Sequence, residues 1–205
     1  AGWTPEAAGN TGAGNVWGLM SADEARDLLA ATDPNETAAL VLSSVVALRA
    51  NSADRSGPVA VIGAGRAAGG IGHEVLRSIV DNGFRGQVWP VHPEAAEVAG
   101  LPAVPSIGAV PERVDLAVVC VPARAVPEVV EACGAARVGT LLVITAGFGD
   151  DGGDATARER AVADLARRHG MRLIGPASLG VVTTNPAVRL HATFAPVTVA
   201  PGRVG

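Results

Sequence analysis

Five short apolar runs, separated by stretches with helical periodicity, constrain the fold of this 205-residue chain more than any other feature. The clearest are VAVIG at residues 59–63, VDLAVVCVP at 114–122 and TLLVITAG at 140–147. Nearly continuous apolar strands are typical of a parallel sheet whose two faces are both covered by helices. The pattern therefore predicts an α/β fold, Rossmann-like and doubly wound, with a mainly parallel sheet.

The same alternation predicts the other elements. Further strands are expected at 87–91 and 171–176, and helices at 71–82, 125–136 and 155–169. The last residues, 180–205, are expected to form loops and strands. Hydrophobic residues make up 48% of the chain but aromatic residues only 3%, so the core must be aliphatic.

The N-terminal quarter has a different character, and we expect it to form a tail and a helical hairpin over residues 1–57. Ser21–Glu24 and Asp33–Glu36 each match a helix-capping pattern, which predicts two helix starts. The turn-forming residues Asn51–Gly57 then mark a boundary. The main domain is therefore expected over residues 58–205.

Composition excludes several function classes. All 16 basic residues are arginine, so a Schiff-base lysine and a lysine-containing phosphate loop are both excluded. The formal net charge of −4 argues against nucleic acid or an anionic membrane as a partner.

The two cysteines, Cys120 and Cys133, are too few for a disulfide framework. The longest apolar stretch outside the strands is about half of the ~20 residues that a membrane-spanning helix needs. The first residues also lack the basic and apolar segments of a signal peptide. These features together predict a cytoplasmic protein.

A glycine-rich segment, GAGRAAGGIG at residues 63–72, directly follows the first strand and opens the first helix. Glycine permits close backbone approach, and the free amides of a helix N-terminus stabilise phosphates. We therefore expect a diphosphate-binding loop. An NAD enzyme would place Asp or Glu at the end of the second strand, whereas His92-Pro93 stands there and Glu94 follows. This difference, and the length of the loop, favour a ligand other than NAD.

Several longer blocks occur in a characteristic order: VAVIGAG, GGIGHEVLRSI, GFRGQVWPVHP, VDLAVVCVPARAVPEVVEACG, LLVITAGFGD and GMRLIGPASLG. With these blocks, about the last 70% of the chain resembles the CoA-binding domain of the NDP-forming acyl-CoA synthetases. This is the superfamily of the succinyl-CoA synthetase α subunit, and it includes an actinobacterial type fused to an acetyltransferase domain.

The resemblance implies that coenzyme A or an acyl-CoA is the cofactor and that strand-end loops bind it. Arg66 is the natural cation for a phosphate. No catalytic residue and no metal ligand is expected on this chain. The implied CoA-binding residues are Gly63, Gly65, Arg66, Ala67, Ala68, Gly70, Gly72, His92, Pro93, Val121, Pro122, Ala123, Ile144, Thr145 and Ala146.

The resemblance also implies the reaction and the partners. The family makes an acyl-CoA from an acid, CoA and a nucleoside triphosphate, through an acyl phosphate and a phosphohistidine on another domain. The expected partners are that phosphohistidine domain and an ATP-grasp subunit or domain, and a homo-oligomer stays open. The chain is then a fragment or component that is not competent alone. Two alternatives are a non-catalytic CoA- or nucleotide-sensing module of an acetyltransferase-linked regulator and an NAD(P)-binding oxidoreductase domain.

Four positions depart from the family pattern. His92, Ala177 and His191 stand where the family has asparagine, and Glu94 stands where it has a basic residue, so that its carboxylate would repel a 3′-phosphate. The replacements could change the ligand, weaken CoA binding or mark a domain retained for assembly. The other two histidines have simpler expected roles. His73 is expected to face the helix N-terminus or solvent, and His169 to complement the dipole at a helix end.

Overall fold

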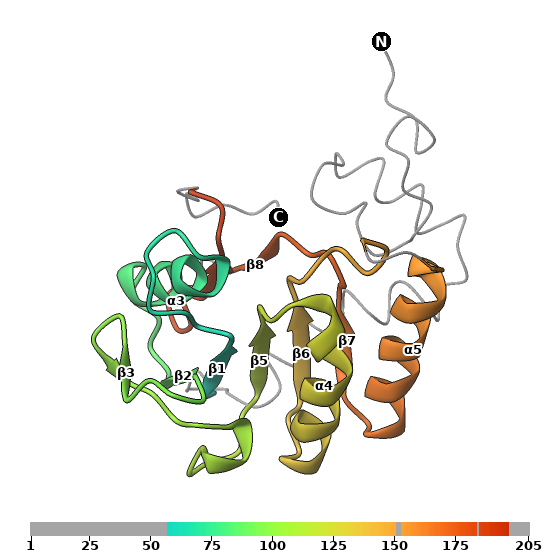
Figure 1. Ribbon diagram of the computed structural model, residues 1–205. Helices are drawn as coiled ribbons and strands as arrows, with labels where there is room; N and C mark the ends of the chain where they lie inside the picture. The colour runs from blue at the N-terminus through green and yellow to red at the C-terminus, as the bar shows by residue number, and fades with distance from the viewer. Residues whose placement is uncertain (1–56, 151–152, 184, 197–205) are drawn as a thin grey trace, which may run out of the picture.

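A five-stranded parallel sheet organises the computed structural model, which describes residues 57–150, 153–183 and 185–196 (Figure 1). Every neighbouring pair in the sheet is parallel. The expected Rossmann-like α/β fold with a mainly parallel sheet is therefore confirmed. In the order β2-β1-β5-β6-β7, the strands are Val88–Val91, Val59–Ile62, Leu116–Val119, Thr140–Val143 and Arg172–Ile174.

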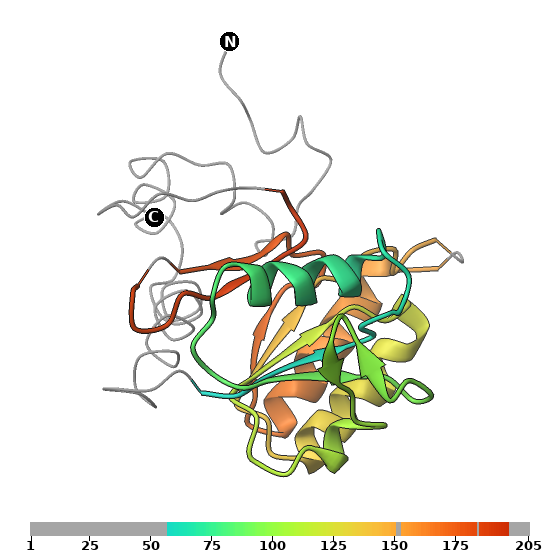
Figure 2. The same ribbon diagram turned by 90° about the vertical axis from the view of Figure 1, so that its left-hand side faces the viewer.

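One layer of structure covers each face of the sheet (Figure 2). Helix α3 (Ile71–Asp81) covers one face together with the hairpin of β8 (Gly180–Val182) and β9 (His191–Thr193). Helices α4 (Val126–Ala135) and α5 (Ala155–Arg168) pack against each other on the opposite face.

The first strand shows why its sequence is entirely apolar. Val59 and Val61 enter the core on the α3 side, whereas Ala60 and Ile62 enter the core under α4 and α5. Successive side chains of a strand point to opposite faces, and here both faces are covered. A polar residue would therefore be buried at any of these four positions, all of which are buried.

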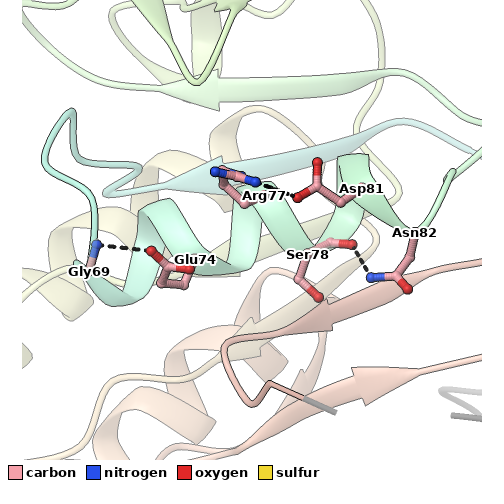
Figure 3. Close-up of polar contacts among 6 residues, drawn as sticks. All are labelled: Gly69, Glu74, Arg77, Ser78, Asp81 and Asn82. Atoms are coloured by element: carbon pink, nitrogen blue, oxygen red, sulfur yellow. Dashed lines mark hydrogen bonds and ion pairs between the residues drawn. The ribbon is translucent and has the colours of Figure 1, made fainter. Parts of the chain in front are cut away.

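Helix α3 has a buried apolar side and a largely polar exposed side, although Ile71 and Val80 are exposed. On its exposed side Arg77 Nη2 lies 2.8 Å from Asp81 Oδ2, and after its last turn Asn82 Nδ2 donates to the Ser78 carbonyl at 2.8 Å (Figure 3). This amphipathic pattern orients the helix on the sheet. The fully buried side is formed by Val75, Leu76 and Ile79.

Helix α5 begins at a residue whose side chain caps its first turn. The Asp154 side chain accepts a hydrogen bond from the Ala157 amide at 3.0 Å, which satisfies one of the free amides of the first turn. Asp154 is therefore the N-cap of α5.

The proline-rich stretch between β2 and β5 has more regular structure than its sequence suggests. It holds the short hairpin of β3 (Glu97–Val98) and β4 (Leu101–Pro102) and the 3-10 turn η2 (Ile107–Ala109). Ala99 and Gly100 between the two strands both have positive φ, at 51° and 79°, which is the backbone of a tight hairpin turn. A second 3-10 turn, η3 (Ala123–Ala125), precedes α4.

The strands are shorter than the apolar runs that predict them. The runs 114–122 and 140–147 extend past β5 and β6, which end at Val119 and Val143. The apolar residues that follow leave the sheet and form loops at its carboxyl edge. The helical hairpin expected within residues 1–57 falls on residues 1–56, outside the described part. No helix among the described residues has the length and apolar character to cross a membrane.

Candidate functional site

The strand order places a crevice at the carboxyl ends of β1 and β5. From β1 the chain goes to β2 on one side, and the next strand of the sheet, β5, pairs with β1 on its other side. In open α/β sheets, ligands bind at such a switch point, where the loops after the strands diverge. The loops after β1, β2, β5 and β6 carry the residues that the sequence predicts for the site, except Gly72, which lies in the first turn of α3.

Two glycines fix how closely helix α3 approaches the end of β1. Gly63 has a φ of +85°, and a Cβ built on it would lie 2.8 Å from the Cys120 carbonyl oxygen. A Cβ on Gly72 would collide with the Gly63 carbonyl oxygen. These two predicted site residues therefore act through the backbone, because they allow β1, β5 and α3 to meet.

The outer part of the same loop is open. A Cβ built on Gly65 or Gly69 would have no atom within 4 Å apart from its chain neighbours, and Arg66, Ala67 and Ala68 between them are exposed. The loop leads into the N-terminus of α3, whose first amides lack helical partners. This segment thus offers backbone donors and one guanidinium to an anion.

A carboxylate already takes one of these donors. The Gly69 amide donates to Glu74 Oε1 at 2.9 Å, across the first turn of α3 (Figure 3). The contact shows that the loop amides attract negative charge, as the helix dipole predicts. Sequence reasoning missed Glu74, although an acidic residue in the first turn after a glycine-rich loop is a recognisable signal.

His73 holds the loop from beneath. Its side chain is buried, and Nδ1 donates to the Gly65 carbonyl oxygen at 3.0 Å. The expectation that His73 faces the helix N-terminus or solvent is therefore wrong as to solvent. Its ring packs under the loop because α3 lies directly against β1.

His92 explains one departure from the family pattern. Its Nδ1 accepts hydrogen bonds from the amides of Glu94 and Ala95, at 3.1 and 3.0 Å. An asparagine carbonyl oxygen makes this kind of bond to amides two or three residues ahead. His92 therefore stabilises the turn after β2, and Pro93 lies exposed within that turn.

The loops after β5 and β6 are joined by a side chain. Thr145 Oγ1 donates to the Val121 carbonyl oxygen at 2.7 Å. Around this bond Val121 and Ala123 are half-buried, and Pro122 and Ala146 are exposed. Ile144, by contrast, is 4% exposed and packs in the core on the α3 side, so it brings only its backbone to the edge.

Ala177, the second departure, lies at the same edge, and nothing in the structure explains why it replaces asparagine. Its amide donates to the Thr145 carbonyl oxygen at 2.9 Å, and its φ is +55°. Asparagine adopts this left-handed conformation more readily than alanine does. The family's asparagine would suit the backbone here better, so alanine leaves the loop with conformational strain.

His191 lies away from the predicted site. It pairs with Val182 near the end of the β8–β9 hairpin, whose turn receives a hydrogen bond from the Arg85 amide just after α3. Burial lowers the pKa of His191, and the positive charge of Arg189 lowers it further. Its Nδ1 is buried without a hydrogen-bond partner among the described residues.

The two cysteines are poor nucleophiles in this fold. Burial raises the pKa of both Cys120 and Cys133 to about 12, so both remain thiols at neutral pH. Arg124 in η3 is exposed after β5 and adds a second guanidinium that sequence reasoning did not single out. The carboxyl edge presents groups that suit an anion, but the Cys120 thiol there does not supply a reacting group.

Comparison with known proteins agrees with this reading. Residues 58–184 match the family model of a CoA binding domain. The chain is 39% identical over 146 residues to the ADP-forming acetate–CoA ligase I of Archaeoglobus fulgidus, a match that covers 71% of this chain and 21% of the ligase. It is 38% identical over 148 residues to the α subunit of the ADP-forming acetate–CoA ligase I of Pyrococcus furiosus, covering 70% and 32%.

A solved structure gives the same result. The dinucleotide-forming acetyl-coenzyme A synthetase 1 of Ca. Korarchaeum cryptofilum, in complex with phosphate and ADP, superimposes with a TM-score of 0.66 at 37% identity. The match covers 74% of this chain and 32% of the synthetase. The chain thus spans about a fifth to a third of the length of these relatives. The resemblance drawn from the sequence is confirmed, and the chain belongs to the CoA binding domain family.

Proposed function

We propose that this chain binds coenzyme A at the carboxyl edge of its sheet and forms the CoA-binding part of an ADP-forming acid–CoA ligase. Residues 58–205 form the binding domain in this proposal. Its site comprises Gly63, Gly65, Arg66, Ala67, Ala68, Gly70, Gly72, His92, Pro93, Val121, Pro122, Ala123, Ile144, Thr145 and Ala146.

The open glycine loop carries the proposal. Residues 66–70 are exposed at the N-terminus of α3, and the hydrogen bond from the Gly69 amide to the Glu74 carboxylate supports an anion site there. The diphosphate of CoA is such a group. Arg66 supplies a guanidinium that can form a charge-assisted hydrogen bond with a phosphate oxygen.

The neighbouring loops suit the rest of the cofactor. Pantetheine is a long, largely apolar arm with two amides, and it needs a groove with mixed character. Residues 121–123 and 145–146 present alanine, proline and valine side chains together with backbone carbonyls. In the proposal the arm follows these loops across the ends of β5 and β6.

The chemistry then occurs on other parts of the enzyme. In the proposed reaction an acid, CoA and a nucleoside triphosphate give an acyl-CoA, a nucleoside diphosphate and phosphate. This chain positions the CoA thiol, while a phosphohistidine domain and an ATP-grasp domain or subunit supply the phosphoryl group. The relatives' greater length and the subunit named in one of them support this division of labour.

A second candidate is a module that binds CoA without taking part in a ligase. Ala177 favours this candidate, because alanine lacks the side-chain amide with which the family's asparagine could contact a ligand. Its backbone is also strained, with a positive φ. An NAD site receives less support, since His92 bonds its own backbone where an acidic residue would bind the ribose.

Calorimetric titration of the full chain with CoA, acetyl-CoA, NAD and ATP tests these alternatives. We expect CoA and acetyl-CoA to bind and NAD not to bind. Binding of NAD alone would overturn the proposal. If CoA binds but no acyl-CoA forms after the phosphohistidine and ATP-grasp parts are added, the non-catalytic module is the correct function.

A further inference from the structure

The amino edge of the sheet, opposite the proposed CoA site, contains a cavity of about 330 Å³. It lies where β5, β6 and β7 begin and where α4 and α5 end. Its lining includes Arg113, Arg137, Arg172, His169 and Asp115. Nothing in the proposed CoA site uses these residues.

The cavity concentrates positive charge from three separate segments. Arg113 precedes β5, Arg137 follows α4 and Arg172 opens β7, while Asp115 is the one carboxylate in the lining. Arg113 Nε donates to the Arg137 carbonyl oxygen at 3.2 Å. Within the described ranges the guanidinium groups of Arg137 and Arg172 make no hydrogen bond or ion pair, so their charges stay available to a ligand.

Arg137 occupies a position where glycine would be less strained. It follows the C-cap of α4 with a φ of +57°, and Gly170 follows the C-cap of α5 with a φ of +69°. The left-handed conformation is costly for any residue with a Cβ, which is why helices commonly end on glycine. The chain thus keeps a guanidinium at the cavity in spite of a conformational cost.

Helix dipoles account for only part of this charge. The negative ends of α4 and α5 attract cations, which explains Arg137 and His169. His169 also has its own partner, because Nε2 lies 2.6 Å from Glu131 Oε2. Arg113 and Arg172 belong to the sheet side of the cavity, so a helix end does not explain their presence.

We propose that this cavity, formed by Arg113, Arg137 and Arg172, binds a small phosphorylated molecule that carries at least two negative charges. A guanidinium presents parallel donors that match phosphate oxygens, and three of them around one cavity compensate a doubly charged group. The cavity is at the lower end of the usual size range of small-molecule sites. The site is independent of the CoA proposal, because its residues and its edge of the sheet are different.

The test is a titration of the isotopically labelled full chain with inorganic pyrophosphate, followed by NMR. We expect the amide resonances of Gly139 and Gly170, which line the cavity, to shift. Shifts confined to Gly65 and Gly69 would overturn the proposal, because they would place the anion in the glycine loop. Tighter binding of malonate than of pyrophosphate would overturn the phosphate class.

Two variants sharpen the test. Arg137→Gly removes a cavity guanidinium and relieves the backbone, so we expect pyrophosphate to bind at least about tenfold more weakly and the melting temperature to stay equal or rise. Arg189→Gly is the matched control, since Arg189 is also exposed with a φ of +55° but lies outside the cavity. Equal weakening in both variants would overturn the site.

A further variant, Arg172→Gln, removes a cavity charge at a residue whose φ is not positive, so backbone strain does not change. We expect the same weakening of pyrophosphate binding as in Arg137→Gly. CoA is titrated separately and read at Gly65 and Gly69. In the unsubstituted chain, absence of a pyrophosphate response at Gly139 together with a normal CoA response would end this proposal alone. Absence of a CoA response together with a normal pyrophosphate response would end only the proposed function.

Discussion

The two edges of the sheet use opposite means to attract negative charge. At the carboxyl edge the attracting groups are backbone amides, which belong to the open loop at residues 65–70 and to the N-terminus of α3. At the amino edge the helices end, so their free carbonyls repel anions and side chains must supply the charge. Parallel strands with crossover helices impose this polarity on the whole fold. The comparison shows that the same topology offers one site built into the backbone and one that depends entirely on arginine placement.

The largest expected effect separates the two kinds of glycine in the backbone site. Gly72→Val should lower the free energy of unfolding by about 2–3 kcal/mol, because its side chain would press into the Gly63 carbonyl. Gly65→Ala should change it by less than about 0.5 kcal/mol, since its Cβ meets open space. Urea unfolding measures both. An equal loss in the two variants would contradict the roles assigned here.

The next prediction tests whether the edges act independently. Arg66→Ala should weaken CoA binding by about 1–3 kcal/mol, because a charge-assisted hydrogen bond to a phosphate is lost. Arg137→Ala, at the opposite edge, should leave CoA binding unchanged. Calorimetry with CoA measures both. If Arg66→Ala has no effect, its guanidinium is a solvated surface group and the backbone alone holds the diphosphate.

A substitution at Glu74 tests whether removing a negative charge from the glycine loop increases its affinity for CoA. Its carboxylate occupies the Gly69 amide and repels an incoming phosphate. Glu74→Gln should strengthen CoA binding by about 0.5–1 kcal/mol and lower the stability of the free protein by a similar amount. Glu128→Gln is the control, because Glu128 is the acidic residue in the first turn of α4. A gain in affinity in both variants would indicate a general effect of net charge.

The smallest expected effect concerns strain in the loop after β7. Ala177→Asn should raise the free energy of unfolding by about 0.5–1 kcal/mol, because asparagine tolerates a φ of +55° better. Ala99→Asn, at a φ of 51° in the β3–β4 turn, should give a similar gain. Thermal unfolding measures both. A loss at Ala177 with a gain at Ala99 would show that packing around Thr145 selects alanine.

Much of the carboxyl edge could be predicted because its signals are local. The glycine-rich run after VAVIG predicts the loop, and the helix expected at 71–82 is observed at Ile71–Asp81. The sequence predicts His92 as a CoA-binding residue but does not predict that its ring accepts hydrogen bonds from two backbone amides. Those bonds depend on the turn that contains Pro93. The burial of the Ile144 side chain could not be predicted. In a sequence, an apolar residue after a strand is the same whether its side chain lines a groove or packs in the core.

The amino edge could not be predicted at all. Arg113, Arg137 and Arg172 are separated by 24 and 35 positions, counted from their numbers, and none stands in a recognisable pattern. They converge because the strands β5, β6 and β7 start side by side. Single arginines are common on protein surfaces, so their positions in the sequence do not indicate that they cluster in the fold.

The amino-acid sequence by itself determined the architecture of this protein. Alternating apolar runs and amphipathic helices leave a covered parallel sheet as the way to bury both strand faces, and the glycine run marks the loop where α3 meets β1. Tertiary structure decided which side chains face one another: Glu74 on the loop amide, Thr145 between two loops, and the arginines at the opposite edge. Periodicity is a property of neighbouring residues, whereas these contacts join segments that only the packed sheet brings together.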